Sequence, residues 1–348
     1  MLAAVVIVLG FHAALFFGGI VLPGQHVDGQ PLADGTRRHY KLSGAVLFAA
    51  THVVLLVATL AFGLSLAPLL DRFWALFWAT SVLAIVTGVV LYLQGIRRGA
   101  PRDVGHFLMG PELNPTWLGV DLKMFAYQPS LIGLWCLILA FGYAQWERHG
   151  TLTGRMLLFQ AFWWVYLVTH YQREAFMLQT WDVIAEHFGL ALAWGDLVLV
   201  PFFYCIAGWT LVDDLAPLTA PAAVGLVAFF ALALWLFRGA NDQKNRFKAD
   251  RGARIWGRPA ETLDGRILVS GWWGVGRHLN YTGEILVYLA IAMTAGTASV
   301  VPYLLPLWLA ALLAHRALRD ERRCRAKYGA LWDAYAARAR FRMVPFVY

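Results

Sequence analysis

Cationic, aromatic and amide side chains that could hold an anionic ligand gather in three segments of the second half of the chain. These segments are Arg238 to Arg258, Gly271 to Tyr281 and His315 to Tyr328. The middle one reads G-W-W-G-V-G-R-H-L-N-Y. Aromatic faces can stack on a planar ring, an Asn side chain can bond an amide, and Arg or Lys can meet phosphates. The combination predicts a site for a flat, multiply anionic cofactor, with an anionic lipid head group as the alternative.

Other kinds of chemistry lack a matching pattern. The sequence has no Walker loop and no nucleophile elbow, and the glycines of Gly271 to Gly276 do not have the spacing of a dinucleotide fingerprint. None of the ten histidines belongs to an H-E-x-x-H motif, so metal catalysis is disfavoured and no metal is expected. The three cysteines, Cys136, Cys205 and Cys324, are scattered and indicate neither a disulfide framework nor a metal site. No nucleic-acid partner is expected.

A second group of polar residues lies within or beside apolar segments, where ionisable groups are costly and usually mark a cavity or a pathway. The alternative is a polar loop between two spans, and for Asp196 a role at a helix N-terminus. The group comprises Tyr166, His170, Gln172, Arg173, Glu174, Asp182, Glu186, His187 and Asp196.

These residues must be positioned by membrane helices. Of the 348 residues, 59% are hydrophobic and only 14% are charged, and the mean hydropathy is +0.57. Apolar blocks near 20 residues long can cross a bilayer, and there they must be helices. Nine blocks are predicted as spans: Met1 to Leu22, Leu42 to Leu66, Phe73 to Leu93, Leu131 to Tyr143, Leu157 to Val168, Leu192 to Val212, Ala222 to Phe237, Ile285 to Met293 with its flanks, and Pro302 to Ala314.

A tenth span is possible between Tyr171 and Leu192, so the predicted fold is an all-α polytopic bundle of about ten transmembrane helices. We predict one membrane domain over residues 1–348, with N-terminal spans in 1–145 and the catalytic and cofactor-binding spans in 150–348. The Arg-rich and Lys-rich segments 238–258 and 315–342 are predicted to lie in the cytoplasm by the positive-inside rule. The two spans between them provide the even number of crossings that this requires.

At these residues the chain resembles the sterol reductase family, which includes the Δ14-sterol reductases, the C-terminal part of the lamin B receptor and the 7-dehydrocholesterol reductases. F-R-G-A-N-D-Q-K-N at Phe237 to Asn245 and L-V-S-G-W-W-G at Leu268 to Gly274 are similar to family motifs, as is Arg277-His278-Leu279-Asn280-Tyr281. Further matches are G-P-E-L-N-P from Gly110, D-x-K from Asp121, the region from Glu174 to Asp196, and the C-terminal signature from His315 to Gly329. The similarity covers nearly the whole chain in order.

The resemblance implies NADPH as reductant and a sterol that enters from the lipid bilayer, with membrane lipids as surroundings. It implies an ionic reaction in which an acid protonates the alkene and a hydride quenches the carbocation at the adjacent carbon. Tyr166 and Asp320 are the candidates for proton delivery, with Glu112, His170, Asp182 and Glu186 as possible relay residues. The implied cofactor contacts are Lys244, Lys248, Trp273, His278, Asn280, Tyr281, Arg316, Arg319, Lys327 and Tyr328.

Two departures from the family pattern stand in this sequence. Gly105-His106 replaces an aromatic–acid pair, and Leu279 replaces a Pro. The C14–C15 bond is the favoured target, with Δ7 reduction as the alternative within the family. An isoprenylcysteine-type methyltransferase using S-adenosylmethionine, and a transporter or lipid-binding scaffold, are the alternatives outside it. The membrane is predicted to be endoplasmic reticulum or a bacterial inner membrane, and the sequence leaves the oligomeric state open.

Overall fold

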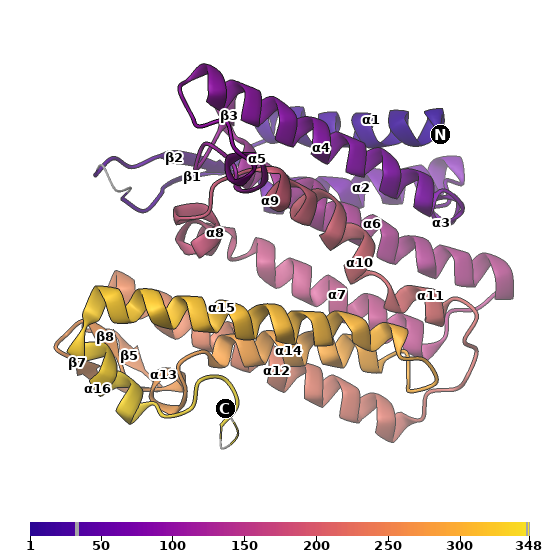
Figure 1. Cartoon of the computed structure of the whole chain (residues 1–348). Coiled ribbons are helices and arrows are strands. Elements are labelled where there is room, and N and C mark those ends of the chain that lie inside the picture. Colours follow the sequence, from indigo (N-terminus) through magenta and orange to yellow (C-terminus); the bar gives the residue numbers. More distant parts are fainter. Residues whose placement is uncertain (32–34, 346, 348) are drawn as a thin grey trace. The chain divides into compact units, whose positions relative to one another are not determined.

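The computed structural model describes residues 1–31, 35–345 and 347, which form a mostly helical chain with four short β-hairpins (Figure 1). By its internal contacts the chain divides into two compact units. Unit 1 comprises residues 1–152 and 163–214, and unit 2 comprises residues 153–162 and 215–348. The predicted single domain stays a prediction.

Unit 1 contains most of the N-terminal spans. Its helices are α1 (Leu2–Val21), α2 (Gly44–Phe62), α3 (Pro68–Asp71), α4 (Phe73–Arg97), α5 (Val104–Met109), α6 (Leu122–His149), α8 (Trp181–Ile184), α9 (Leu190–Trp194), α10 (Val200–Tyr204) and α11 (Ala207–Leu211). It also holds the 3-10 helix η1 (Glu174–Gln179), the π-helix η2 (Gly195–Leu199) and two hairpins, β1 (Gln25–Asp28) with β2 (His39–Leu42) and β3 (Thr116–Trp117) with β4 (Val120–Asp121). Helix α7 (Gly154–Tyr171) belongs to unit 1 from Trp163 onward.

Helix α6 is the most buried of the long apolar helices and provides the core of unit 1. Asp121 begins it, because the Asp121 Oδ1 accepts from the backbone N–H groups of Lys123 and Met124, both at 3.0 Å. Gly150 ends it with a left-handed φ of 68°, which suits glycine because it has no Cβ to clash. The cap residues therefore fix both ends of the helix on which unit 1 packs.

Unit 2 contains the segments in which the sequence places the ligand. Its helices are α12 (Ala220–Ala249), α13 (Trp272–Val275), α14 (Leu279–Met293), α15 (Leu304–Tyr328) and α16 (Ala330–Arg338), with the 3-10 turn η3 (Val301–Tyr303) and the first part of α7. Two hairpins, β5 (Arg254–Ile255) with β6 (Arg258–Pro259) and β7 (Thr262–Leu263) with β8 (Ile267–Leu268), follow α12. Helix α14 packs against both α12 and α15.

Seven helices of the described chain are long and apolar enough to cross a membrane, and a shorter apolar helix, α14, has 15 residues. The seven are Leu2–Val21, Gly44–Phe62, Phe73–Arg97, Leu122–His149, Leu190–Leu211, Ala220–Ala249 and Val301–Tyr328. The range Leu190–Leu211 contains the successive elements α9, η2, α10 and α11, and Val301–Tyr328 contains η3 and α15. The all-α polytopic fold is thereby confirmed, but the count of ten is not. The segment between Tyr171 and Leu192 does not supply a tenth span, because before α9 begins at Leu190 it forms only the six-residue η1 and the four-residue α8.

Candidate active site

A glycine at the start of α13 brings two tryptophans onto the polar end of α12. Gly271 has φ 62°, and a Cβ there would lie 2.6 Å from Ile255 Cγ2 and would also collide with the Gln243 side chain. The backbone N–H of Trp272 donates to Gln243 Oε1 at 2.9 Å. Only glycine fits this contact without displacing its neighbours, so Gly271 fixes where Trp272 and Trp273 lie.

Trp273 connects α13 to the Lys244 side chain. Its indole Nε1 donates to the Ala240 carbonyl of α12 at 2.8 Å, and the buried ring faces Lys244, whose Nζ lies 4.6 Å from the ring centroid. A cation over a Trp face is attracted by the ring quadrupole. Lys244 itself is exposed. The pair therefore presents a fixed cation at the surface of unit 2.

Two asparagines join α14 to α12 near this cation. Asn241 Nδ2 donates to the Phe237 carbonyl at 3.1 Å, and Asn280 Nδ2 donates to Asn241 Oδ1 at 3.2 Å. The Asn280 Oδ1 is buried without a hydrogen-bond partner among the described residues. A buried amide oxygen without a partner is costly, so Asn280 is suited to accept a hydrogen bond from a ligand.

His278, Tyr281 and Asp320 form a chain of contacts between α14 and α15. The His278 and Tyr281 rings stack with centroids 5.2 Å apart and planes 10° apart. The Tyr281 hydroxyl donates to Asp320 Oδ2 at 2.6 Å. A hydroxyl and a carboxylate in direct contact can hold and pass a proton.

Burial governs the charge of His278. Loss of solvent lowers the pKa of His278 to about 4, the carboxylates of Asp320 and Glu321 oppose this change, and the cations Lys244 and Arg277 add to it. The imidazole is therefore neutral near pH 7. Its Nε2 atom is buried without a hydrogen-bond partner and lies 4.0 Å from Glu321 Oε1.

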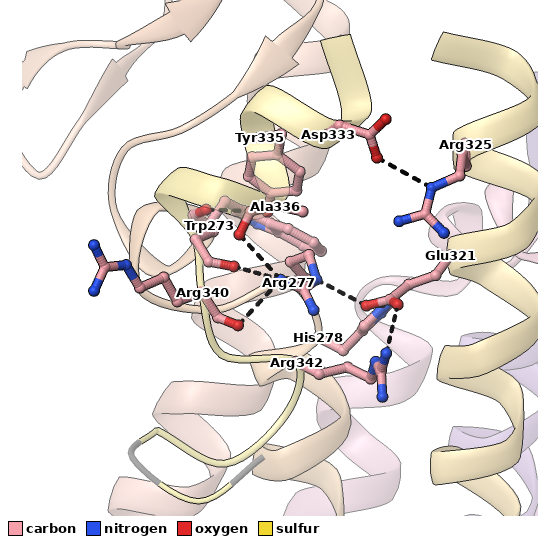
Figure 2. A network of polar contacts seen from close by, with 11 residues as sticks. Trp273, Arg277, His278, Glu321, Arg325, Asp333, Tyr335, Ala336, Arg340 and Arg342 are labelled. Carbon is pink, nitrogen blue, oxygen red and sulfur yellow. Dashed lines mark hydrogen bonds and ion pairs between the residues drawn. The ribbon is translucent and has the colours of Figure 1, made fainter. Parts of the chain in front are cut away.

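Figure 2 shows a network of polar contacts around Arg277 and Glu321 of α15, next to His278. Arg277 Nε donates to Glu321 Oε1 at 2.7 Å, and Arg342 Nη2 lies 3.0 Å from Glu321 Oε2. Arg277 Nη1 also donates to the carbonyls of Ala339 at 2.7 Å and Arg340 at 3.1 Å. The guanidinium and carboxylate groups thus compensate each other's desolvation. Together they hold residues 339–343, called the C-terminal segment below.

This C-terminal segment crosses the start of α14 and is tied to it by backbone contacts. Arg277 N–H donates to the Phe341 carbonyl at 3.0 Å, and His278 N–H to the Arg342 carbonyl at 2.8 Å. Thr282 Oγ1 donates to the Met343 carbonyl at 2.6 Å. Residues 277–282, which include His278, are therefore held against residues 341–343.

Tyr335 of α16 supports α13 through a hydrogen bond to the backbone of Trp273. Its hydroxyl donates to the Trp273 carbonyl at 3.0 Å, and burial raises the pKa of Tyr335, so it keeps the proton that it donates. The Trp273 ring that faces Lys244 is therefore held at its backbone as well as at its indole nitrogen.

The other cofactor contacts implied by the resemblance also lie in unit 2. Lys248 follows Lys244 by one turn of α12, and the charges of Lys244, Arg323 and Lys327 all act on it. Lys327 Nζ lies 5.1 Å from the centroid of the Tyr328 ring. On α15, Arg316 precedes Asp320 by one turn, and Arg319 is exposed. The structure brings cations of α12 and α15 together, and their cofactor role stays a prediction.

Tyr166 lies in unit 1, where it is buried and contacts the edge of Trp163 with centroids 5.7 Å apart. That Tyr166 and Asp320 act at one site stays a prediction. The predicted relay residues also lie in unit 1. Glu112 pairs with Arg98 at 2.6 Å, and Glu186 accepts from Trp181 Nε1 at 2.6 Å.

Asp182 and Glu186 contribute backbone atoms to a buried lysine. The fully buried Lys123 donates from Nζ to the carbonyls of Asp182 at 2.7 Å and Glu186 at 2.6 Å. His170 contacts the ring of Tyr171 edge-on, with centroids 5.3 Å apart. In unit 1, the Asp182 and Glu186 carbonyls bind Lys123, and His170 packs against Tyr171. The proton relay stays a prediction.

Sequence reasoning missed three residues that support the site: Asn241, Gln243 and Glu321. Asn241 and Gln243 precede Lys244 in the F-R-G-A-N-D-Q-K-N run. The helical spacing of three could have placed Asn241 on the same face as Lys244. Glu321 had no comparable signal, because its partners Arg277 and Arg342 are distant in sequence.

A nicotinamide nucleotide fits the residues present. His278 Nε2 and Asn280 Oδ1 are buried polar atoms that have no hydrogen-bond partner in the described chain, and the Lys244 cation of α12 lies close enough to act on His278. Within the described residues, no group of three or more His, Cys, Asp or Glu side chains is arranged to hold a metal ion.

The comparisons with known proteins agree along the whole chain. The model of the ergosterol biosynthesis ERG4/ERG24 family matches residues 3–348. The chain is 35% identical to a Delta(14)-sterol reductase of Arabidopsis thaliana over 100% of its own length and 96% of the relative's. It is 35% identical to a Delta(14)-sterol reductase of Methylotuvimicrobium alcaliphilum, covering 97% and 83% of the two chains. It is 31% identical to a 7-dehydrocholesterol reductase of Danio rerio, covering 92% and 72%.

These matches reach through every motif on which the resemblance was based, from Gly110 to Gly329. The prediction of an oxidoreductase enzyme is confirmed by them, and together with the apolar helices they identify an integral membrane protein. The chain therefore belongs to the ergosterol biosynthesis ERG4/ERG24 family, the sterol reductases.

Proposed function

We propose that this protein reduces a carbon–carbon double bond of a sterol, with the C14–C15 bond as its target and NADPH as the reductant. The observation that carries the proposal is the contact between Tyr281 and Asp320 at 2.6 Å in a chain of this family. It supplies a proton-holding pair beside exposed cations and beside buried polar atoms that have no partner. The bond is chosen because two relatives at 35% identity are named Delta(14)-sterol reductases.

The residues that would hold the cofactor divide by chemistry. Lys244, Lys248, Arg316, Arg319 and Lys327 would meet its phosphates, since guanidinium and ammonium groups form charge-assisted hydrogen bonds with them. Asn280 and His278 would bond the carboxamide, and the rings of Trp273, Tyr281 and Tyr328 would contact planar parts. When bound, a reduced nicotinamide supplies a hydride. The additional phosphate of NADPH favours it over NADH at so cationic a site.

Proton delivery would depend on residues of this chain. One alkene carbon gains a proton, the adjacent carbon gains the hydride, and the π bond between them is lost. Either the Tyr281 hydroxyl, which donates to Asp320, or the Tyr166 hydroxyl would protonate the alkene, and Asp320 would relay a replacement proton to Tyr281. A phenol with a pKa near 10 is protonated at neutral pH and can donate when its oxygen is in contact with a relay.

The second candidate is reduction of a Δ7 bond, supported by the 7-dehydrocholesterol reductase at 31% identity. In both cases the sterol would enter from the bilayer, and the cofactor would bind on the cytoplasmic face of the endoplasmic reticulum or of a bacterial inner membrane. The cytoplasmic placement is supported by the excess of Lys and Arg at the ends of α12 and α15.

The test is to incubate the purified, detergent-solubilised protein with NADPH and a Δ8,14-dienol and to follow the products by gas chromatography–mass spectrometry. A gain of two mass units located at C14–C15 is expected, at a higher rate with NADPH than with NADH. Reduction of a Δ7 sterol but not of the dienol would replace the chosen bond with the second candidate. Failure with both sterols, together with binding of S-adenosylmethionine, would reject the reductase function in favour of a methyltransferase.

A further inference from the structure

The β5–β6 hairpin carries a tryptophan at its tip in a conformation that this residue rarely adopts. Trp256 has φ 50° and Gly257 has φ 77°, so both turn residues lie in the left-handed region. Two-residue turns of this kind favour Asn and Gly, because a Cβ at positive φ crowds the backbone. Arg254 Nε donates to the Gly257 carbonyl at 2.9 Å and closes the turn. A strained aromatic residue in such a place indicates a use for its indole outside the turn.

The Trp256 indole extends a row of aromatic rings that begins on α12. Its ring centroid lies 5.2 Å from that of Trp272, and Trp272 lies 4.9 Å from Trp235, both with edge-on geometry. Trp256 is 58% exposed and Trp235 is 55% exposed. The two outer rings are therefore open to the surroundings of the protein, and the middle ring joins them.

Trp235 lies where α12 leaves the apolar part of the membrane. The exposed apolar side chains of α12 recur at helical spacing along one face, at Val224, Val227, Leu232 and Trp235. The first charged residue of the helix, Arg238, follows within one turn. From Ala220 to Phe237 the helix rises about 27 Å, close to the ~30 Å of a hydrocarbon core. Trp235 is therefore at the level where Trp side chains gather in membrane proteins.

The charges of the hairpin suit lipid phosphates. Arg254 and Arg258 flank the turn and are both exposed, and the residues from Arg254 to Pro259 include no carboxylate. Guanidinium groups bind phosphate oxygens with directed hydrogen bonds, and basic residues next to a membrane span attract anionic lipids. An indole between two such arginines matches both the apolar and the anionic parts of the lipid interface.

We propose that the β5–β6 hairpin is a membrane anchor, which seats the Trp256 indole among the lipid head groups and binds anionic phospholipid phosphate through Arg254 and Arg258. The occupant is the lipid surface that continues from the exposed face of α12. The anchor holds the polar end of α12 at a fixed depth, and it does so independently of the reaction catalysed.

The depth of Trp256 is tested by fluorine NMR on protein labelled with 5-fluorotryptophan in lipid nanodiscs. The chain has 16 tryptophans, and the resonances of Trp256 and Trp235 are identified by their loss in Trp256→Asn and Trp235→Phe. Asn suits the left-handed turn, so the first variant keeps the fold. A head-group nitroxide lipid is expected to broaden both resonances several-fold more than a water-soluble gadolinium chelate does. Strong broadening of Trp256 by the chelate alone would place the hairpin in water and overturn the proposal.

The lipid preference is tested by native mass spectrometry of detergent-purified protein with added phosphatidylglycerol or phosphatidylcholine. Wild type is expected to retain several-fold more phosphatidylglycerol, and the double variant Arg254→Gln/Arg258→Gln to lose this preference. Arg102→Gln, an exposed arginine of unit 1, is the matched control and is expected to behave as wild type. Equal retention by the double variant and wild type would refute the phosphate contact.

Discussion

Tyr281 and Asp320 meet through one hydrogen bond although 39 positions separate them in the sequence. The contact has a chemical consequence: if the Tyr281 hydroxyl gives its proton to the alkene, the neighbouring Asp320 can relay another proton to it. Stacking on His278 limits the rotation of the Tyr281 ring. At the scale of single residues, the proposed proton transfer depends on this pair.

The first prediction concerns the hydroxyl alone. Tyr281→Phe keeps the stacked ring and removes the contact with Asp320, so kcat for sterol reduction should fall by about 100-fold or more while KM for NADPH changes little. Product formation by gas chromatography–mass spectrometry measures both constants. Tyr303→Phe is the matched control, since it removes a hydroxyl that donates to the Gly296 carbonyl at the opposite end of α15. A Tyr281→Phe enzyme with the wild-type kcat would exclude this hydroxyl from proton transfer.

The second prediction follows from the lowered pKa of His278. The unfolded chain takes up a proton at this residue near pH 6.5, whereas the folded chain does so only near pH 4. Stability is therefore highest above pH 6.5 and falls by up to about 3 kcal/mol as the pH drops to 4. Unfolding in detergent at several pH values should show this loss in wild type and a smaller one in His278→Phe. Identical pH dependence in the two proteins would contradict the assignment.

Helices α12 and α14 approach each other closely at one glycine. A Cβ on Gly283 would lie 2.5 Å from the backbone nitrogen of Phe237 and 2.7 Å from its Cα. Backbone atoms cannot move aside as a flexible side chain can, so the distance between these helices depends on Gly283. The Asn280–Asn241 contact, one turn earlier, depends on the same distance.

The third prediction tests this approach with a single methyl group. Gly283→Ala should lower the free energy of unfolding by about 1–3 kcal/mol, because the helices must separate to admit the Cβ. Gly225→Ala on α12 is the control, since no atom lies within 4 Å of the added Cβ and alanine favours the helix. Thermal unfolding in detergent measures both. A Gly283→Ala protein as stable as the Gly225→Ala protein would show that the helices are not in contact there.

The C-terminal segment is held by charges as well as by backbone hydrogen bonds. Glu321 accepts from Arg277 and pairs with Arg342, and its side chain is 10% exposed. Buried pairs of this kind compensate their own desolvation, so removal of one partner leaves an uncompensated charge.

The fourth prediction compares a buried with an exposed carboxylate. Glu321→Ala should destabilise the protein by about 3–5 kcal/mol and release the chain after Ala339 to proteases. Asp333→Ala is the matched control, because the Asp333–Arg325 pair is 60% exposed on both sides and such pairs contribute less than about 1 kcal/mol. Thermal unfolding and limited proteolysis give the two readouts. Equal effects of the two substitutions would mean that the network does not hold the segment.

At the scale of the whole molecule, the crossings of α14 and α15 decide whether the two cationic ends of the candidate site lie on the same side of the membrane. Both the end of α12 and the end of α15 are rich in Lys and Arg. If α14 and α15 each cross the bilayer, these ends lie on one side and the segment between the helices on the other. Helix α14 has only 15 residues, fewer than the about 20 that usually cross a bilayer, so its crossing is the one that most needs a test.

The fifth prediction concerns this topology. Cysteines introduced as Ala249→Cys and Ala326→Cys should react with an impermeant thiol reagent from the same side of sealed vesicles, and Ala298→Cys only from the other side. All three positions are exposed in the structure. The protein without these substitutions controls for Cys136, Cys205 and Cys324. Reaction of all three from one side would show that α14 and α15 do not each cross the membrane.

The sequence by itself determined the class of molecule, because the signals for it are local. Apolar blocks predict spans wherever they stand, and each of the nine predicted blocks contains helix in the structure. The motifs from Gly110 to Gly329 were sufficient for the sterol reductase family, which the comparisons confirm. The tenth span was not decided in this way, since charged residues such as Arg173, Glu174, Asp182 and Glu186 recur among the apolar residues of that segment.

The tertiary structure alone decided which of the polar residues meet. The contact of Asn241 with Asn280 depends on the close approach of α14 to α12 at Gly283. The ion pair of Glu321 with Arg342 depends on the position of the C-terminal segment. Asp320 was one of the two candidates for proton delivery, with Tyr166, but its contact with Tyr281 depends on the packing of α14 against α15. The physical reason is that helix formation and membrane insertion depend on neighbours within a few turns, whereas hydrogen bonds across helices depend on how closely backbones approach, which no single segment encodes.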